Sequence, residues 1–366
     1  MLDIEVTRRC NLRCDYCFVG WSRDWTSDLP REAALEVVEE GAGLFDTLHL
    51  TGGEPFVYEH VWEVIEAGLS YGYREVFINT NATTLTDESI RRLASHAPRV
   101  ALSVSLDGPE HLHDAVRGRG RFRKSARTLA ALLEAGVPTT VNTVVTPAVL
   151  EVLAPFLFAL RDDYPKLAGV TLFPVGVGPD ESSRKPGAQV RPLTPRELVR
   201  LARLVALIDR TGLPVGVGAY PVINPLLLEY GYPAARLYQC TAGRGRVCVH
   251  ADLSVSTCHP VKEAVYGRWR KGLLRELGAF PAHRRLAARD FDGCRSCEHQ
   301  ETCGHCRAFV HAAGEPLFGN DKICVPVRDE GLPAVQRPFA EAAPTARQTT
   351  GSKLVQLRRA ANLDYS

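Results

Sequence analysis

An alternation of strand-like and helix-like segments in the first 210 residues constrains the fold more than any other feature of the chain. Apolar or β-branched runs typical of strands lie at residues 2–7, 47–50, 75–79, 100–106, 139–145 and 170–175. Segments with helical periodicity lie at residues 31–42, 60–69, 87–95, 124–134, 148–161 and 195–210. Six strand-then-helix units in series imply parallel strands joined by right-handed crossovers. The sequence therefore predicts an α/β fold, with either an open sheet or a barrel.

Length and composition narrow the class of protein. The 366 residues suffice for one domain of about 200 residues and a smaller second one. The longest apolar run is far below the ~18 residues of a membrane span, and no signal peptide precedes the first strand. A formal net charge of +2 gives no electrostatic reason to expect a nucleic-acid partner. We therefore expect a cytoplasmic protein with no membrane segment and no nucleic-acid partner.

Eleven cysteines fall into three groups, and residues 18–239 contain none. The first group is spaced C-x3-C-x2-C, and the other eight lie in the last third of the chain. The groups are Cys10, Cys14 and Cys17; Cys240, Cys248 and Cys258; and Cys294, Cys297, Cys303 and Cys306, followed by Cys324. In a cytosolic protein, closely spaced thiols are more often metal ligands than disulfide partners.

Three loops that follow predicted strands carry chemically distinctive residues. The first cysteine group follows the first strand, a Gly-Gly-Glu-Pro segment at residues 52–55 follows the second, and the fourth strand runs into residues 103–109. Since parallel strands place these loops at one rim, we expect them to meet at one site. Soft thiolate ligands suit an iron–sulfur cluster, and a cluster held by three of them leaves one iron open. An open coordination position indicates reactivity.

The segment Cys-Asn-Leu-Arg-Cys-Asp-Tyr-Cys at residues 10–17, together with the Gly-Gly-Glu-Pro loop, resembles the signature of radical S-adenosylmethionine (SAM) enzymes. The resemblance covers residues 1 to about 215 and implies a partial (β/α)6 TIM-like barrel. It also implies that one electron from the cluster cleaves SAM to methionine and a 5′-deoxyadenosyl radical. By the same resemblance, Cys10, Cys14 and Cys17 hold the cluster, Tyr16 contacts the adenine, Gly52, Gly53 and Glu54 receive the methionyl amine, and Ser105 and Arg117 bind the SAM carboxylate.

Each motif has an ordinary alternative when it is taken alone. A Gly-Gly pair forms tight turns, a Ser-Leu-Asp-Gly segment can end a strand, Arg117 could be a surface charge, and three cysteines can bind zinc. Their occurrence together, in order and at the ends of successive predicted strands, favours the SAM site.

The eight C-terminal cysteines resemble the SPASM extension of a subset of radical SAM enzymes. That resemblance implies two auxiliary [4Fe–4S] clusters, one bound by Cys240, Cys248, Cys258 and Cys306, the other by Cys294, Cys297, Cys303 and Cys324. Only Gly304 and His305 separate Cys303 from Cys306, whereas the usual pattern has three residues there. The shorter spacing is similar to that of relatives that mature quinone cofactors, mycofactocin and tetrapyrroles. Zinc is the alternative metal for the paired C-x2-C units.

The sequence does not decide the roles of the residues beside the C-terminal cysteines. A hairpin is predicted around residues 251–252. His250 and His259 adjoin predicted ligands, where each is either an exposed loop residue or a hydrogen-bond donor to sulfur. Three side chains are candidates for proton transfer by position only: Asp252, Asp292 and Tyr238.

We predict a radical SAM core at residues 1–213, a connector at 214–237, a SPASM domain at 238–326 and a partly disordered tail at 327–366. The expected activity is oxidative modification of a peptide or protein. The alternatives are oxidation of a small molecule (a tetrapyrrole side chain, a sugar or a nucleoside) and a non-enzymatic electron carrier. The expected partners are a precursor peptide or small substrate, a flavodoxin- or ferredoxin-type electron donor and, for a peptide, a separate leader-binding protein.

Overall fold

The computed structural model describes residues 1–19, 24–176, 190–261, 263–292, 294–295, 297–303, 306–312, 315–319, 323–324, 327 and 330. All eleven cysteines are among them. The tail predicted for residues 327–366 lies outside the described residues, except at Val327 and Glu330.

The six predicted strands are all present and form one parallel array, so the predicted α/β fold with a partial barrel is confirmed. Neighbouring strands pair in chain order, from β1 to β6. Their bounds are β1 Leu2–Thr7, β2 Thr47–Gly52, β3 Glu75–Thr80, β4 Val100–Ser105, β5 Thr139–Val145 and β6 Val170–Pro174.

Three more strands extend this array at its two ends. At one end, β7 (Val215–Val217) pairs with β6, inside the segment expected to be a connector. At the other end, β8 (Val247–Val249) pairs in parallel with β1, and β9 (Val255–Ser256) pairs antiparallel with β8. The predicted hairpin is therefore confirmed, and it continues the barrel sheet. Since β7 and β9 are the end strands of the nine-stranded sheet, the barrel is open between them.

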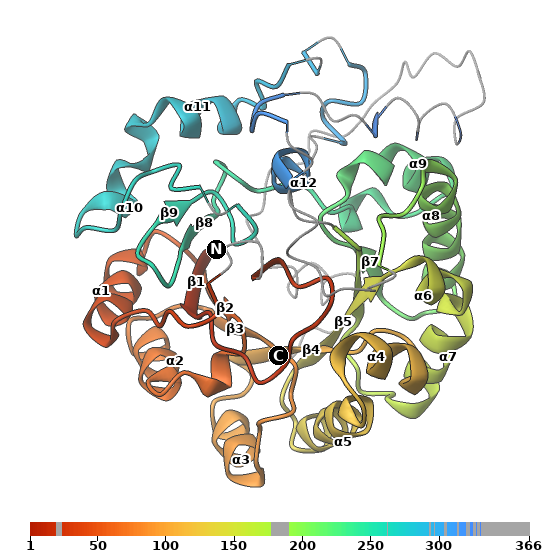
Figure 1. The fold of residues 1–366 in the computed structure, drawn as a ribbon, viewed down its shortest axis with the longest axis horizontal. Helices are drawn as coiled ribbons and strands as arrows, with labels where there is room; N and C mark the ends of the chain where they lie inside the picture. The colour runs from red at the N-terminus through yellow and green to blue at the C-terminus, as the bar shows by residue number, and fades with distance from the viewer. Residues whose placement is uncertain are drawn as a thin grey trace.

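Helices lie around the outside of the strands, as Figure 1 shows. They are α1 Arg31–Gly41, α2 Val61–Ser70, α3 Asp87–Ser95, α4 Glu110–Arg117, α5 Arg121–Glu134, α6 Pro147–Glu151, α7 Leu153–Asp163 and α8 Pro195–Asp209. The helix predicted at residues 148–161 is divided into α6 and α7 at Val152, and α4 was not predicted. The start of α8 is fixed by a capping box in which Thr194 and Glu197 bond reciprocally.

Side chains along β1 alternate between an apolar face and a polar face of the strand. Leu2, Ile4 and Val6 belong to the hydrophobic core, which includes residues of the surrounding helices. Asp3 and Glu5 point to the opposite face of the sheet because successive side chains alternate. Both are fully buried and bonded to partners. The inner face of the barrel at β1 is therefore polar. A site at the rim of the barrel would open toward this face.

The C-terminal region contacts both ends of the open sheet. It contains α9 (Asn224–Glu229), α10 (Leu273–Glu276), α11 (Pro281–Ala287), α12 (Arg307–Ala312) and short 3-10 turns at Pro221–Ile223, Ala234–Arg236 and Leu277–Ala279. From α12, the Phe309 ring lies 4.8 Å from the Tyr220 ring, beyond β7. A Cβ at Gly176, beyond β6, would lie only 1.7 Å from Phe309 Cε1. Thus α12 contacts the β6–β7 end, while β8 continues the other end (Figure 1). No helix in the described ranges is long and apolar enough to span a membrane.

Candidate SAM and iron–sulfur site

The three cysteines of the first group lie half-buried in the loop directly after β1. Cys10 Sγ accepts hydrogen bonds from Leu12 N at 3.3 Å and from Asn81 Nδ2 at 3.8 Å. Burial raises the pKa of Cys10 to about 11 and that of Cys14 to about 12, and the neighbouring cysteines add to both shifts. A bound metal cation would offset this penalty, because it stabilises the thiolate form. The donor set of three soft sulfurs fits an iron–sulfur cluster.

Across the described residues, no group of three or more His, Cys, Asp and Glu side chains is arranged to hold a metal ion, and this covers all eleven cysteines. The cysteine assignments therefore remain predictions that rest on the chemistry and placement of the donors.

The glycine loop after β2 packs against the backbone that leads into the cysteine loop. Gly53 N donates to Thr7 O at 2.8 Å, and Glu54 N donates to Arg9 O at 2.9 Å. A Cβ at Gly53 would lie 2.2 Å from Arg9 O, and one at Gly52 would lie 2.1 Å from Thr7 O. Both positions thus require glycine for close approach of two backbones, and Gly52 also has a φ of +141°. The two loops form one unit.

Glu54 is fully buried and joins the loops after β2 and β3. Its carboxylate accepts hydrogen bonds from Thr80 Oγ1 at 2.8 Å, Asn81 N at 2.7 Å and Phe56 N at 3.3 Å. Burial raises the pKa of Glu54 to about 7, although these donors act to lower it. The carboxylate therefore holds the rim together, and its predicted contact with the methionyl amine remains a prediction.

A buried ion pair lies at the end of β4. Arg117 Nε and the Tyr16 hydroxyl both donate to Asp107 Oδ2, and Val144 N donates to Asp107 Oδ1 at 2.8 Å. Burial acts to raise the pKa of Asp107, but Arg117, His113 and the Tyr16 hydroxyl together outweigh it and hold that pKa below its ordinary value. Arg117 also interacts electrostatically with Cys14. The structure thus brings two predicted SAM contacts, Tyr16 and Arg117, together beside the cysteine loop.

Ser105 ends β4 on the same rim, half-buried and paired in register with Asn142 of β5. Two neighbouring residues are not among the predicted site residues. Asp107 lies inside the predicted segment 103–109, and its position two residues after Ser105 is the signal that marks it. Asn81 directly follows β3, between strands whose ends had been assigned, so strand order alone could have marked it.

Among the C-terminal cysteines, the structure brings three together. Cys306 interacts electrostatically with Cys240 and Cys258, and burial raises the pKa of Cys258 to about 11. Cys248 lies fully buried on β8, beside β1. Three of the four ligands predicted for one auxiliary cluster are therefore neighbours, and the assignment of all eight stays a prediction.

The second predicted set is Cys294, Cys297, Cys303 and Cys324. Cys294 packs against Phe291 and Leu286, whereas Cys303 and Cys324 adjoin the main core. The remaining member is Cys297, whose N–H donates to Cys294 O at 3.0 Å.

Of the candidates for proton transfer, Asp252 forms an ion pair with Arg8 at 2.9 Å. Asp292 is exposed, and burial raises the pKa of Tyr238 well above its ordinary value.

The chain is similar to proteins of known family. Residues 4–151 match the family model of the Radical SAM superfamily. Mycofactocin maturase MftC of Mycolicibacterium smegmatis is 27% identical over 365 residues, covering 96% of this chain and 88% of the relative. The AdoMet-dependent heme synthase of Methanosarcina barkeri is 26% identical over 347 residues, covering 88% and 95%. The solved structure of anSMEcpe with bound AdoMet and Cp18Cys peptide has a TM-score of 0.68 at 17% identity, covering 90% of this chain and 95% of that one.

Proposed function

We propose that the chain cleaves SAM reductively and oxidatively modifies a peptide in a maturation pathway, because residues 4–151 match the model of the Radical SAM superfamily. The observation that carries this proposal is the meeting of three segments at one rim: the cysteine loop after β1, the glycine loop after β2 and the Asp107–Arg117 pair after β4. An electron carrier has no need of the last two segments.

Cys10, Cys14 and Cys17 would hold a [4Fe–4S] cluster through three of its irons. When bound, that cluster supplies the electron that cleaves SAM to methionine and a 5′-deoxyadenosyl radical. The chain's own contribution is to bind and orient SAM and to exclude water from the rim, since misplacement by about 1 Å can cost ~100-fold in rate.

The binding roles follow from the contacts at the rim. Arg117 is held by Asp107 with only 9% of its side chain exposed, so its guanidinium is oriented before a carboxylate binds. Ser105 would add a hydroxyl, and the ring of Tyr16 would face the adenine. The backbone and carboxylate of Gly52–Glu54 would receive the amine. Because the fold already holds these groups in place, SAM binding would cost little side-chain entropy.

We assign the C-terminal cysteines to two auxiliary [4Fe–4S] clusters of a SPASM domain. The proximity of Cys240, Cys258 and Cys306 supports the first of them. Eight protein ligands for two clusters leave no iron open to substrate, so these clusters would carry electrons. A route for removing an electron suits a net oxidation of the substrate.

A peptide substrate is supported by the relatives, since one is named a maturase and one solved neighbour holds a peptide. The electron donor would be a flavodoxin- or ferredoxin-type protein, and a separate protein could present the peptide. The second candidate is oxidation of a tetrapyrrole or another small molecule, which is favoured by the likeness to the heme synthase over 88% of this chain.

The test is anaerobic reconstitution with iron and sulfide, followed by SAM and dithionite. Wild-type protein should form 5′-deoxyadenosine and bind about 12 iron per chain, as three cubanes require. Cys14→Ala should form none. Wild-type protein that forms no 5′-deoxyadenosine with or without peptide would contradict the proposal. Mass spectrometry of a candidate peptide and of a tetrapyrrole, each incubated with the enzyme, separates the two substrate classes.

A further inference from the structure

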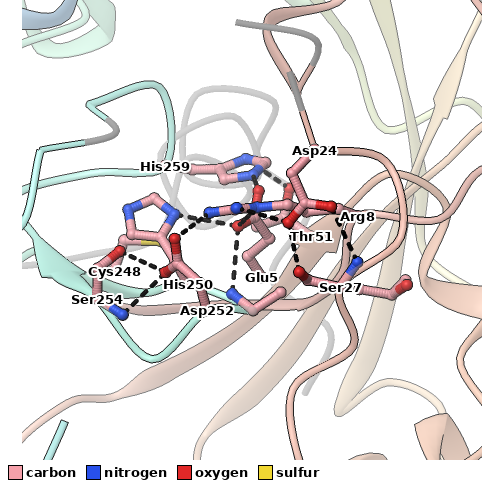
Figure 2. A network of polar contacts seen from close by, with 12 residues as sticks. Glu5, Arg8, Asp24, Ser27, Thr51, Cys248, His250, Asp252, Ser254 and His259 are labelled. Carbon is pink, nitrogen blue, oxygen red and sulfur yellow. Dashed lines mark hydrogen bonds and ion pairs between the residues drawn. The ribbon is translucent and has the colours of Figure 1, made fainter. Parts of the chain in front are cut away.

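Charged side chains close to β1 are paired inside the molecule, as the network in Figure 2 shows. Glu5, fully buried on β1, lies 2.8 Å from His259 Nε2 and 3.2 Å from His250 Nδ1. Arg8 donates to Glu5 at 3.0 Å and to Asp252 at 2.9 Å. Both histidines are buried, so neither is an exposed loop residue. The charges of this network are satisfied by one another and leave nothing for a partner to recognise.

The corner between α4 and α5 departs from this pattern. Residues 117–127 contain six cations and no acid, in a chain whose formal net charge is only +2. The first of the six, Arg117, is buried in its pair with Asp107. The exposed ones, which form the α5 basic surface, are Arg119, Arg123, Lys124 and Arg127.

Carboxylates leave most of the α5 basic surface unneutralised. Arg123 pairs with Glu110 at 2.8 Å, whereas the other three members form no ion pair with any residue that the structure describes. The nearest acid in the sequence, Asp114, accepts hydrogen bonds from the backbone of Gly120 and Phe122 instead. On other helices around the barrel, exposed arginines pair with carboxylates: Arg31 with Glu63, Arg91 with Glu88 and Arg200 with Glu151.

This charge pattern opposes the formation of α5. Lys124 and Arg127 are three positions apart and Arg123 and Arg127 are four apart, spacings at which like charges on a helix repel each other. Cations near the start of a helix also oppose its dipole, and the first turn of α5 contains no acid. Since the pattern weakens the free protein, a role in stability does not explain it, and binding of an anionic partner does.

The α5 basic surface lies beside the rim of the barrel. On the opposite side of α5, the buried Ser125 hydroxyl donates to Asn81 O at 2.7 Å, and Asn81 Nδ2 donates to Cys10 Sγ at 3.8 Å. The first turns of α5 are therefore fixed to the loop that follows β3. From this point α5 runs along the outside of the barrel, beside α3 and α4 (Figure 1).

The shape of the surface favours one class of ligand. From its first residue to Arg127, α5 rises about 9 Å, so a small molecule held at the rim by Arg117 would not cover the surface. An extended peptide rises about 3.3 Å per residue, and three or four of its residues would span this length. A row of side chains on one helix is also far smaller than the roughly 800 Å² per partner of a stable interface between folded proteins. The surface therefore fits a short acidic stretch of a peptide.

We propose that the α5 basic surface binds an acidic stretch of the peptide substrate, outside the barrel, while another residue of the same peptide enters the rim. The inference rests on the proposed function, since it takes the substrate to be a peptide. The cations contact neither SAM nor the reacting atoms. They speed the encounter with an acidic peptide and select against a basic one.

The test uses the reconstituted protein and a fluorescein-labelled peptide with four consecutive glutamates between Gly-Ser spacers. A second peptide has glutamine at these four positions. Fluorescence anisotropy at about 0.15 M salt should show saturable binding of the Glu peptide and at least about tenfold weaker binding of the Gln peptide. Because single exposed charge pairs contribute little, two charges are reversed together. Lys124→Glu/Arg127→Glu should weaken binding of the Glu peptide by about tenfold, without lowering the melting temperature.

Arg268→Glu/Arg275→Glu is the matched control. Both arginines are exposed, neither has an ion pair in the part of the chain that the structure describes, and the net charge changes equally. This control should bind the Glu peptide like the wild type.

Equal affinities of the two variants, or of the two peptides, would overturn the inference. So would binding that is lost at 0.15 M salt, tighter binding of a single-stranded RNA oligonucleotide, or a clear fall in the melting temperature of Lys124→Glu/Arg127→Glu. Wild-type protein that forms no 5′-deoxyadenosine with dithionite is a different result, which overturns the proposed function.

Discussion

Replacing Gly53 with alanine tests whether the glycine loop and the cysteine loop are one unit. The added Cβ would lie 2.2 Å from Arg9 O and 2.7 Å from Arg8 O. Both atoms belong to the backbone, so no side-chain rotation relieves the overlap. Overpacking of this kind costs about 1–3 kcal/mol. Separating the loops also weakens the bonds from Gly53 N and Glu54 N, at about 1 kcal/mol each. The expected loss is therefore about 3–5 kcal/mol.

The assay is urea unfolding of the apo protein, with iron content after reconstitution as a second readout. The matched control is Gly278→Ala, because Gly278 has no atom within 4 Å of an added Cβ and no positive φ. We expect Gly278→Ala to change the unfolding free energy by less than about 1 kcal/mol and to leave the iron content unchanged. If Gly53→Ala unfolds at the same urea concentration as this control and binds as much iron, the reasoning about the two loops is refuted.

Three further outcomes are expected. Asp107→Asn should weaken SAM binding about tenfold, equivalent to ~1.4 kcal/mol, because Arg117 loses its anionic partner. The control Asp114→Asn should leave the affinity unchanged. Equal affinities of the two variants in calorimetry would contradict this role of Asp107. Burial lowers the pKa of His113 to about 4. Between pH 6.5 and 4 the unfolded chain therefore binds more protons at this residue than the folded chain does. The free energy of unfolding should decrease by up to about 3 kcal/mol as the pH is lowered through this range. His113→Gln should lose that part of the slope in urea unfolding, and an unchanged slope would count against it. Removing iron with a chelator should lower the melting temperature because a metal bound only by the folded state stabilises it, and an unchanged temperature would contradict metal binding.

Much of the barrel could be predicted because its strands are continuous apolar or β-branched runs and its longer helices have clear periodicity. The elements that were missed are short or depend on distant partners. Strand β7 has three residues, Val-Gly-Val, which are too few to show a period. The pairing of β8 with β1 joins segments about 245 residues apart, and no local pattern announces it.

In the site, too, local motifs can be predicted from the sequence, whereas contacts between distant segments cannot. Cys10, Gly53 and Glu54 belong to motifs with characteristic spacing, so sequence inspection finds them. Glu5 and His259 are 254 positions apart and acquire their relation only when the hairpin joins the barrel. The burial of His259 could not be predicted, because the sequence around Cys258 is typical of a loop.

In the proposed function, the first three cysteines hold a cluster whose open iron binds SAM. The most direct measurement is EPR and ENDOR spectroscopy of the dithionite-reduced, reconstituted protein with SAM labelled with ¹⁷O in its carboxylate and ¹⁵N in its amine. We predict that SAM shifts the EPR signal and that both labels show hyperfine coupling to the cluster, which Cys14→Ala abolishes. A spectrum that SAM leaves unchanged, with no coupling from either label, would contradict the account.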